Sequence, residues 1–183
     1  MARDRGRIFD AYLVASARLG DRKALGALAQ RWNGKLLAHA WRLLSDHEGA
    51  KDAVQESWAE MLRGLSRLRD DEAFAAWAYR IVSRRCARQI GRIRDQRRLA
   101  EEATIAVASA EICPAEPALL DVDAVRRAIK TLPPEQQAAI ALFYLEDMSV
   151  AEVAVALDVP AGTVKTRLMH ERHKLRGALE GDE

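Results

Sequence analysis

The amino-acid sequence predicts an all-α protein made of two small helical domains joined by an acidic linker. Alanine, leucine, arginine and glutamate dominate the chain, and these residues favour helix at most positions. Apolar residues recur at the helical spacing i, i+3, i+4, i+7 in several segments, whereas strand signals are almost absent. Residues 99–121 lose this periodicity and gain small residues, acids and two prolines, which is linker composition. The expected division is therefore 1–98, 99–121 and 122–183.

The first domain begins with segments that have one apolar face each. Ile8–Leu19 is expected to be a helix with an inner face of Ile8, Tyr12, Ala15 and Leu19. Asp21 can cap the next helix, which buries Leu25, Leu28, Ala29 and Trp32. Asn33-Gly34 is expected to break that helix, so that Leu36–Leu44, with Trp41, forms a third segment.

A further helix is expected from about Glu48 to Leu65. Its predicted buried face consists of Val54, Trp58, Met61, Leu62 and Leu65. Its other side presents Asp52, Gln55, Glu56 and Glu60. An acidic stripe of this kind either serves solubility alone or docks a basic partner surface, where opposite fields speed encounter.

The clearest helical periodicity starts near Asp71, after the charged connector Ser66–Glu72. This helix is predicted to bury Phe74, Trp77, Ala78, Ile81 and Val82. It continues into Arg84–Arg98, which holds seven arginines against one acid, whereas Leu99–Asp123 holds six acids and no lysine or arginine. Because the net charge of the whole chain is only +2, this local segregation favours contact with a polyanion over simple solvation.

The second domain is expected to be a four-helix module that ends in a helix-turn-helix. Its first segment carries Val122, Val125, Ile129 and Leu132, and Pro133-Pro134 then opens a helix with Ile140, Phe143 and Tyr144 inward. Ser149 and Glu152 form a capping box before an apolar face of Val150, Val153, Ala154 and Leu157. Asp158-Val159-Pro160 stops that helix.

The last helix has the composition of a DNA-reading helix. Ala161, Val164, Leu168 and Leu175 are expected to be buried. The residues predicted on its other faces are Thr163, Lys165, Thr166, Arg167, Met169, His170 and Arg172. Lys165–Arg176 contains five lysines or arginines against one acid, with side chains that can reach phosphates and guanine edges. This charge favours insertion into a DNA major groove over an ordinary solvated face.

Other classes of protein lack support in the sequence. Cys86 and Cys113 lack a metal-type spacing, and His170 and His173 have no third ligand nearby, so neither a disulfide, a metal nor another cofactor is expected. No catalytic constellation is present, which favours a non-enzyme. The lack of a membrane-length apolar run or a signal-peptide pattern predicts a soluble, cytoplasmic protein without membrane insertion.

Nearly the whole chain resembles the extracytoplasmic-function sigma factors of bacterial RNA polymerase. DAVQESW resembles the polymerase-docking helix of that family, and AFAAWAYRIVSRRCARQIGR resembles the helix that handles the melted promoter strand. LPPEQ followed by GTVKTRL at the family spacing is the most specific match, to the module that reads the −35 element. The resemblance implies RNA polymerase core, promoter DNA as duplex and melted strand, and an anti-sigma factor as partners.

The resemblance also implies roles for individual residues. Polymerase binding is expected of Asp52, Gln55, Glu56 and Trp58. Contacts to the −10 element and its backbone are expected of Arg67, Arg69, Arg84, Arg85, Arg88 and Arg92. Contacts to the −35 element are expected of Thr163, Lys165, Thr166, Arg167, Met169, His170 and Arg172. The stretch EGAKDAVQE departs from the family in carrying Lys51 among its acids.

Two other functions remain open at this point. A stand-alone helix-turn-helix regulator usually dimerises, but the sequence leaves no apolar helix for a dimer seam and gives no task to the module with Trp58 and Trp77. A sigma-like decoy would bind an anti-sigma factor without touching DNA. The basic residues of the last helix argue against the decoy.

Overall fold

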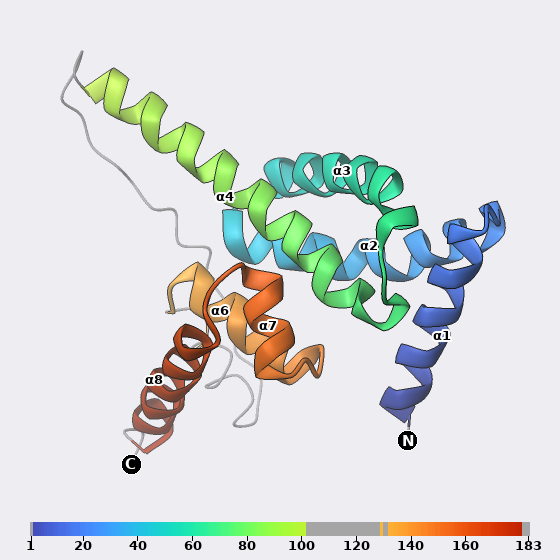
Figure 1. Ribbon diagram of the computed structural model, residues 1–183. Helices are drawn as coiled ribbons and strands as arrows, with labels where there is room; N and C mark the ends of the chain where they lie inside the picture. The colour runs from blue at the N-terminus through green and yellow to red at the C-terminus, as the bar shows by residue number, and fades with distance from the viewer. Residues whose placement is uncertain (1, 102–128, 130–131, 181–183) are drawn as a thin grey trace, which may run out of the picture.

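The protein is a bundle of helices, as the computed structural model in Figure 1 shows. Its backbone is described for residues 2–101, 129 and 132–180, and its side chains for residues 5–96, 129 and 132–170. No strand occurs within these ranges, in agreement with the predicted all-α class. The α-helices are α1 (Ala2–Arg18), α2 (Arg22–Leu44), α3 (His47–Gly64), α4 (Phe74–Glu101), α6 (Pro134–Ile140), α7 (Val150–Leu157) and α8 (Ala161–Glu180).

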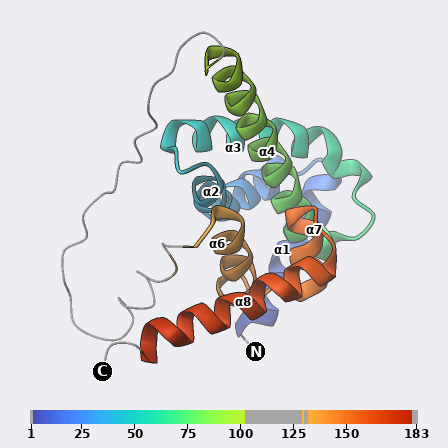
Figure 2. The same cartoon turned by 90° about the vertical axis from the view of Figure 1, so that its left-hand side faces the viewer.

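Helix α2 is the centre of the bundle. Helices α1, α3 and α4 pack on it from the first domain, and α6 packs on it from the second. Helix α7 lies against α4, while α8 packs on α6 and α7. The C-terminal part of α4 projects beyond the other helices, and both views place it at the opposite end of the molecule from α8 (Figures 1 and 2).

An aromatic cluster fills the centre of the first domain. Trp32 of α2 meets the edges of Phe74 and Tyr79 of α4, with ring centroids 5.3 and 5.7 Å apart. His39 lies about two turns further along α2, and its ring centroid is 5.0 Å from that of Tyr79. All four side chains are buried, so α2 and α4 are held together by interlocking rings whose edges face neighbouring ring faces. The predicted inner face of α4 is thereby confirmed at Phe74.

The first helix buries a different face from the predicted one. The prediction was wrong at Ile8, Tyr12 and Leu19, which are 62%, 64% and 90% exposed, whereas Leu13 and Val14 are buried. The inner face instead begins at Asp10, whose carboxylate pairs with the Arg31 guanidinium of α2. Leu13 and Val14 lie three and four positions after Asp10, on the same side of the helix. The ion pair and the two apolar residues therefore select the orientation of α1 together.

Asn33-Gly34 does not interrupt the second helix, contrary to the prediction. Helix α2 is continuous because Leu28, Trp32 and Leu36, spaced four residues apart, are all buried and bridge the expected break. The Asn33 side chain accepts a hydrogen bond from Trp58 Nε1 at 3.2 Å. These contacts outweigh the helix penalty of glycine, about 1 kcal/mol relative to alanine.

Four further residues of the predicted apolar segments are exposed instead of buried. Leu62 and Trp41 are about half exposed, and Ala161, the first residue of α8, is exposed. Tyr144 is 48% exposed because residues 141–145 form a π-helical turn, in which Glu146 N–H donates to the Ala141 carbonyl at 3.1 Å. Such a turn inserts one residue and rotates the side chains that follow.

The first helix of the helix-turn-helix begins and ends as predicted. The amide of Glu152 donates to Ser149 Oγ at 3.2 Å, and the amide of Ser149 donates to Glu152 Oε2 at 2.7 Å, which completes the capping box. Helix α7 ends at Asp158, which adopts the left-handed conformation with φ 56°. Pro134 begins α6, as expected of a proline at a helix start. The expected segment 122–128 and most of the linker, residues 102–121, lie outside the described residues.

Burial of His39 makes the stability of the fold depend on pH. Desolvation, with a smaller contribution from the positive charge of Arg42, lowers the pKa of His39 to about 3. As pH falls below the ordinary pKa of about 6.5, His39 of the unfolded chain binds a proton, whereas the buried His39 of the folded chain stays neutral. We expect the free energy of unfolding to fall by about 2 kcal/mol between about pH 7 and pH 5, measured by urea denaturation.

Two histidine variants provide the control for that measurement. His39→Gln is expected to remove most of this slope, whereas His47→Gln, on an exposed histidine, is expected to leave it intact. An unchanged slope in His39→Gln would contradict the assignment.

Candidate nucleic-acid interface and acidic docking face

The acidic residues of α3 form an exposed face in the middle of that helix. We call Asp52, Gln55 and Glu56 the docking face. All three are exposed, while Ala53, Val54 and Ser57 between and beside them are buried against the bundle. Neither Asp52 nor Gln55 makes an ion pair or side-chain hydrogen bond within the part of the chain that the structure describes. The docking face is therefore accessible to a basic partner.

The other two residues near this face have local partners. Trp58 is half-buried and its indole N–H is bound to Asn33 of α2, so it anchors α3 to the bundle. Lys51, the departure from the family pattern, donates to the Glu48 carboxylate at 2.8 Å. The Lys51 hydrogen bond and charge lower the pKa of the Glu48 carboxyl. The Glu48 carboxylate thus offsets the positive charge of Lys51, which directly precedes the docking face.

Arg85 links the acidic helix to the arginine-rich helix. Its guanidinium donates to Glu56 at 2.8 Å and to Glu60 at 2.9 Å, two carboxylates one turn apart on α3. The side chain is only 24% exposed. Sequence reasoning assigned Arg85 to DNA and Glu56 to the polymerase, but the structure brings them together. The i, i+4 spacing of Glu56 and Glu60 was the available signal for a bridging arginine.

The remaining predicted arginines of the first domain point toward solvent. Arg84, Arg88 and Arg92 are exposed on α4. Arg67 and Arg69 are exposed in the connector, which contains two short 3-10 turns, Leu65–Arg67 and Asp71–Ala73. The connector is held in place because Asp71 pairs with Arg18 of α1 at 2.6 Å and Asp70 caps the second turn. These five side chains are available to a phosphate backbone.

From the sequence, no role was assigned to Arg80, which lies one turn before Arg84 on α4. Its Nε and Nη2 atoms lie 3.0 and 2.8 Å from Asp158 Oδ1, in the turn between α7 and α8. The signal was present in the sequence as the regular spacing of Arg80, Arg84 and Arg88.

The last helix presents the basic and hydroxyl face that the sequence predicts. Val164 is fully buried and Leu168 half-buried, whereas Lys165, Thr166, Met169 and His170 are exposed. Thr163 and Arg167 are half-buried, and the Thr166 hydroxyl donates to the Gly162 carbonyl at 3.0 Å. The side chains of Arg172 and Leu175 lie outside the described residues. Helix α8 thus has one face on the domain and one face free to enter a groove.

Other types of site receive no support from the described residues. They contain no group of three or more histidine, cysteine or acidic side chains that could hold a metal ion. Cys86 is buried, and desolvation raises the pKa of its thiol to about 12, which makes it a packing residue. Among the helices that the structure describes, none is long and apolar enough to cross a membrane.

Comparisons with known families match both halves of this chain. A family model described as "Sigma-70 region 2" matches residues 28–99, and one described as "Sigma-70, region 4" matches residues 123–175. The first match includes α3 and nearly all of α4, and the second includes α7 and most of α8. The surfaces described above therefore lie within the two matched regions.

Curated relatives and solved structures agree with this result. The chain is 33% identical to ECF RNA polymerase sigma factor SigM of Mycobacterium tuberculosis, over 93% of this chain and 84% of that one. It is 29% identical to the ECF RNA polymerase sigma-E factor of Escherichia coli, with 95% and 96% covered.

A similar fold occurs in the co-crystal structure of sigma factor RpoE with anti-sigma factor NepR from Bartonella quintana. The identity is 24%, 88% of this chain and 99% of that chain are covered, and the TM-score is 0.65. CnrH in complex with the cytosolic domain of CnrY aligns at 24% identity and a TM-score of 0.63, with 96% and 99% covered. The matches show that the chain belongs to the ECF RNA polymerase sigma factors, which direct the polymerase core to promoters.

Proposed function

We propose that this sigma factor divides its task among three surfaces, on α3, α4 and α8. The docking face of α3 binds a basic surface of the polymerase core, and α4 holds the melted −10 strand. Helix α8 reads the −35 element in the duplex. The observation that carries this division is the joint exposure of Asp52, Gln55 and Lys165 on helices whose apolar faces are buried.

In the first domain, the proposed DNA contacts are electrostatic. Arg84, Arg88 and Arg92 line α4, and Arg67 and Arg69 lie in the connector that captures the melted strand. Single-strand binding combines such a basic track with a pocket for an extruded base. Arg85 is already bridged to Glu56 and Glu60, so we assign it to positioning the docking face.

In the second domain, sequence reading is assigned to α8. Lys165, Thr166, Met169 and His170 are exposed on it, with Thr163 and Arg167 at the edge of the buried face. Phosphate contacts make affinity depend on salt, while contacts to base edges discriminate by about 1–3 kcal/mol for each good bidentate pair. Arg172 extends the same helix and is proposed by its match to the family pattern alone.

The remaining properties follow from this role. The functional units are proposed to be residues 1–98 and 122–183, with 99–121 as the connecting segment. The chain acts in the cytoplasm, where the polymerase works, and it is not an enzyme, since the phosphodiester chemistry belongs to the polymerase. An anti-sigma factor is a proposed partner, supported by the complexes of RpoE with NepR and of CnrH with CnrY.

The direct test is run-off transcription with the bacterial core polymerase on genomic fragments, followed by sequencing of the start sites. We expect start sites that share upstream elements and that are lost when the chain is omitted. A palindromic footprint made by the chain without polymerase would instead favour a stand-alone regulator. Binding to an anti-sigma factor without any transcription would favour a decoy.

Charge reversal of the docking face tests the polymerase contact. Asp52→Lys is expected to weaken binding to core polymerase about tenfold, because an attraction at the interface becomes a repulsion. Fluorescence anisotropy of labelled chain titrated with core enzyme measures this change. Glu135→Lys, the same reversal on an exposed acid of α6, is the control and is expected to bind like the unaltered chain. Equal losses in both variants would contradict the assignment.

A further inference from the structure

Three arginines follow one exposed face of α4. Arg80, Arg84 and Arg88 are spaced four residues apart, so their guanidinium groups lie along the same side of the helix. We call these three residues the arginine ridge. Arg84 and Arg88 are among the residues assigned above to the backbone of the melted strand. Arg80 continues the same track by one turn, but its guanidinium is bound to an acid of the second domain.

The Arg80–Asp158 contact has the geometry of an anion held by an arginine fork. Both Nε and Nη2 of Arg80 point to one carboxylate oxygen, Asp158 Oδ1, at 3.0 and 2.8 Å. Arginine binds phosphate oxygens with the same pair of donors. The side chains of Arg80 and Asp158 are 46% and 48% exposed, so water reaches the pair and a competing anion can displace the carboxylate.

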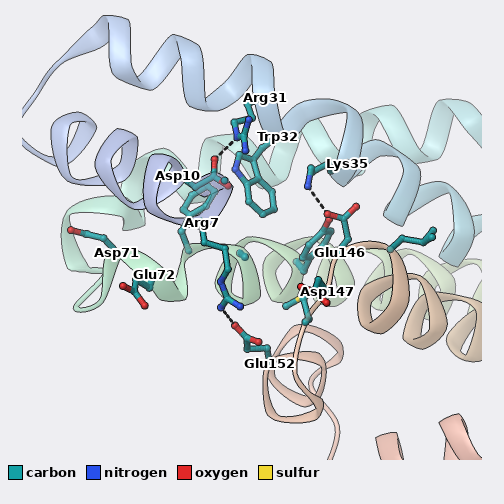
Figure 3. A pocket seen from close by; sticks show the side chains of 16 residues that line it. Arg7, Asp10, Arg31, Trp32, Lys35, Asp71, Glu72, Glu146, Asp147 and Glu152 are labelled. Atoms are coloured by element: carbon teal, nitrogen blue, oxygen red, sulfur yellow. Dashed lines mark hydrogen bonds and ion pairs between the residues drawn. The ribbon is translucent and has the colours of Figure 1, made fainter. Parts of the chain in front are cut away.

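A polar cavity lies beside the apolar contact between the two domains. Arg7 of α1 pairs with Glu152 of α7, and Lys35 of α2 donates to Glu146 at 2.6 Å (Figure 3). A cavity of about 250 Å³ lies between these groups, which is room for several water molecules. The buried Trp32 Nε1 beside it has no hydrogen-bond partner among the described protein groups.

If each domain binds its promoter element as proposed above, the two domains must separate. The −10 and −35 elements are about 25 base pairs apart, which is about 85 Å of duplex at about 3.4 Å per base pair. A compact chain of this length has a radius of gyration of only about 16 Å. The proposed connecting segment, residues 99–121, can extend to about 80 Å, which together with the width of the domains spans this distance.

We infer that Arg80 is a further DNA-backbone contact and that Asp158 blocks it while the two domains are in contact. The Asp158 carboxylate then occupies the place that a phosphate takes when the melted strand lies along the arginine ridge. DNA binding by the first domain and closure of the second domain onto it therefore exclude each other at this residue. The inference rests on the proposed function, because it assigns the ridge to the melted strand.

Single-strand binding by the full-length chain tests this competition. The probe is a short, labelled, mixed-sequence single-stranded DNA, titrated at several salt concentrations without polymerase. Asp158→Asn is expected to tighten binding about two- to fivefold, which corresponds to loss of an exposed ion-pair competitor. Asparagine tolerates the left-handed conformation at position 158, so α7 retains its end.

The decisive comparison combines the two substitutions. Arg80→Ala is expected to weaken binding, and adding Asp158→Asn to it is expected to change nothing, because the carboxylate then has no guanidinium to block. The slope of log affinity against log salt is expected to be shallower by about 0.7 in the double variant than in Asp158→Asn alone, as for loss of one phosphate contact. Arg80→Lys is expected to restore most of that slope.

Controls separate this mechanism from general effects. Glu135→Gln removes an exposed acid from the same domain and is expected to leave DNA affinity unchanged. Equal tightening by Asp158→Asn with and without Arg80 would overturn the inference, as would no tightening at all. In either case, normal run-off transcription by the unaltered chain would leave the proposed function standing, whereas loss of transcription from every promoter would remove that function first.

Discussion

The double substitution Lys165→Glu and Arg167→Glu is expected to abolish promoter-specific transcription while leaving polymerase binding intact. Lys165 is exposed on α8 and Arg167 is half-buried at the edge of the face that packs on the domain. Each reversal replaces attraction to DNA by repulsion and removes a donor that could reach a base edge. With about 1–3 kcal/mol for each such contact, the expected loss is on the order of a hundredfold or more in run-off product.

A matched control is available at the start of α2. Arg22→Glu together with Lys23→Glu changes the same number of charges at exposed positions, where acids are favourable because they lie at a helix N-terminus. This control is expected to transcribe normally. Unchanged output from the Lys165 and Arg167 variant, with the same start sites, would contradict the role of α8 and would favour the decoy.

The second large effect is expected from Phe74→Ala in the aromatic cluster. Phe74 is 1% exposed and meets the rings of Trp32 and Trp77 at 5.3 and 6.0 Å. Removing its ring leaves a cavity at the junction of α2 and α4, and the expected loss is about 3–5 kcal/mol of unfolding free energy. Because single domains have a stability of about 5–15 kcal/mol, this variant is expected to lie near the threshold of folding.

Urea denaturation followed by circular dichroism measures this loss. Phe9→Ala is the control, since Phe9 is 48% exposed on α1 and is expected to change the unfolding free energy by less than about 1 kcal/mol. If Phe74→Ala were as stable as Phe9→Ala, the aromatic cluster could not be the element that joins α2 to α4.

Buried and exposed side chains are expected to contribute differently, the buried ones to stability and the exposed ones to binding. The aromatic rings that fix α2 against α4 are buried, whereas the proposed DNA and polymerase contacts are mostly exposed side chains on α3, α4, α8 and the connector. Substitutions of the exposed residues are therefore expected to change binding with little effect on folding. Arg85 is the exception, because one side chain bridges Glu56 and Glu60 and also joins α3 to α4.

The sequence by itself determined the helical class, the helix-turn-helix and the orientation of its last helix. Capping residues act within a few positions of one another, so Ser149 and Glu152 could be interpreted without knowledge of the rest of the fold. The same holds for Val164 inside and Lys165 outside, which follow from helical periodicity alone. Local signals were sufficient where local interactions decide the structure.

Only the tertiary structure decided which side chains meet across helices. The buried face of α1 was set by the Asp10–Arg31 pair, and the continuity of α2 through Gly34 by the packing of Trp32 and Leu36. Arg85 pairs with Glu60, 25 positions away in the sequence, and Arg80 pairs with Asp158, 78 positions away. Periodicity within one helix carries no information about such partners, because they depend on how separate helices are placed against one another.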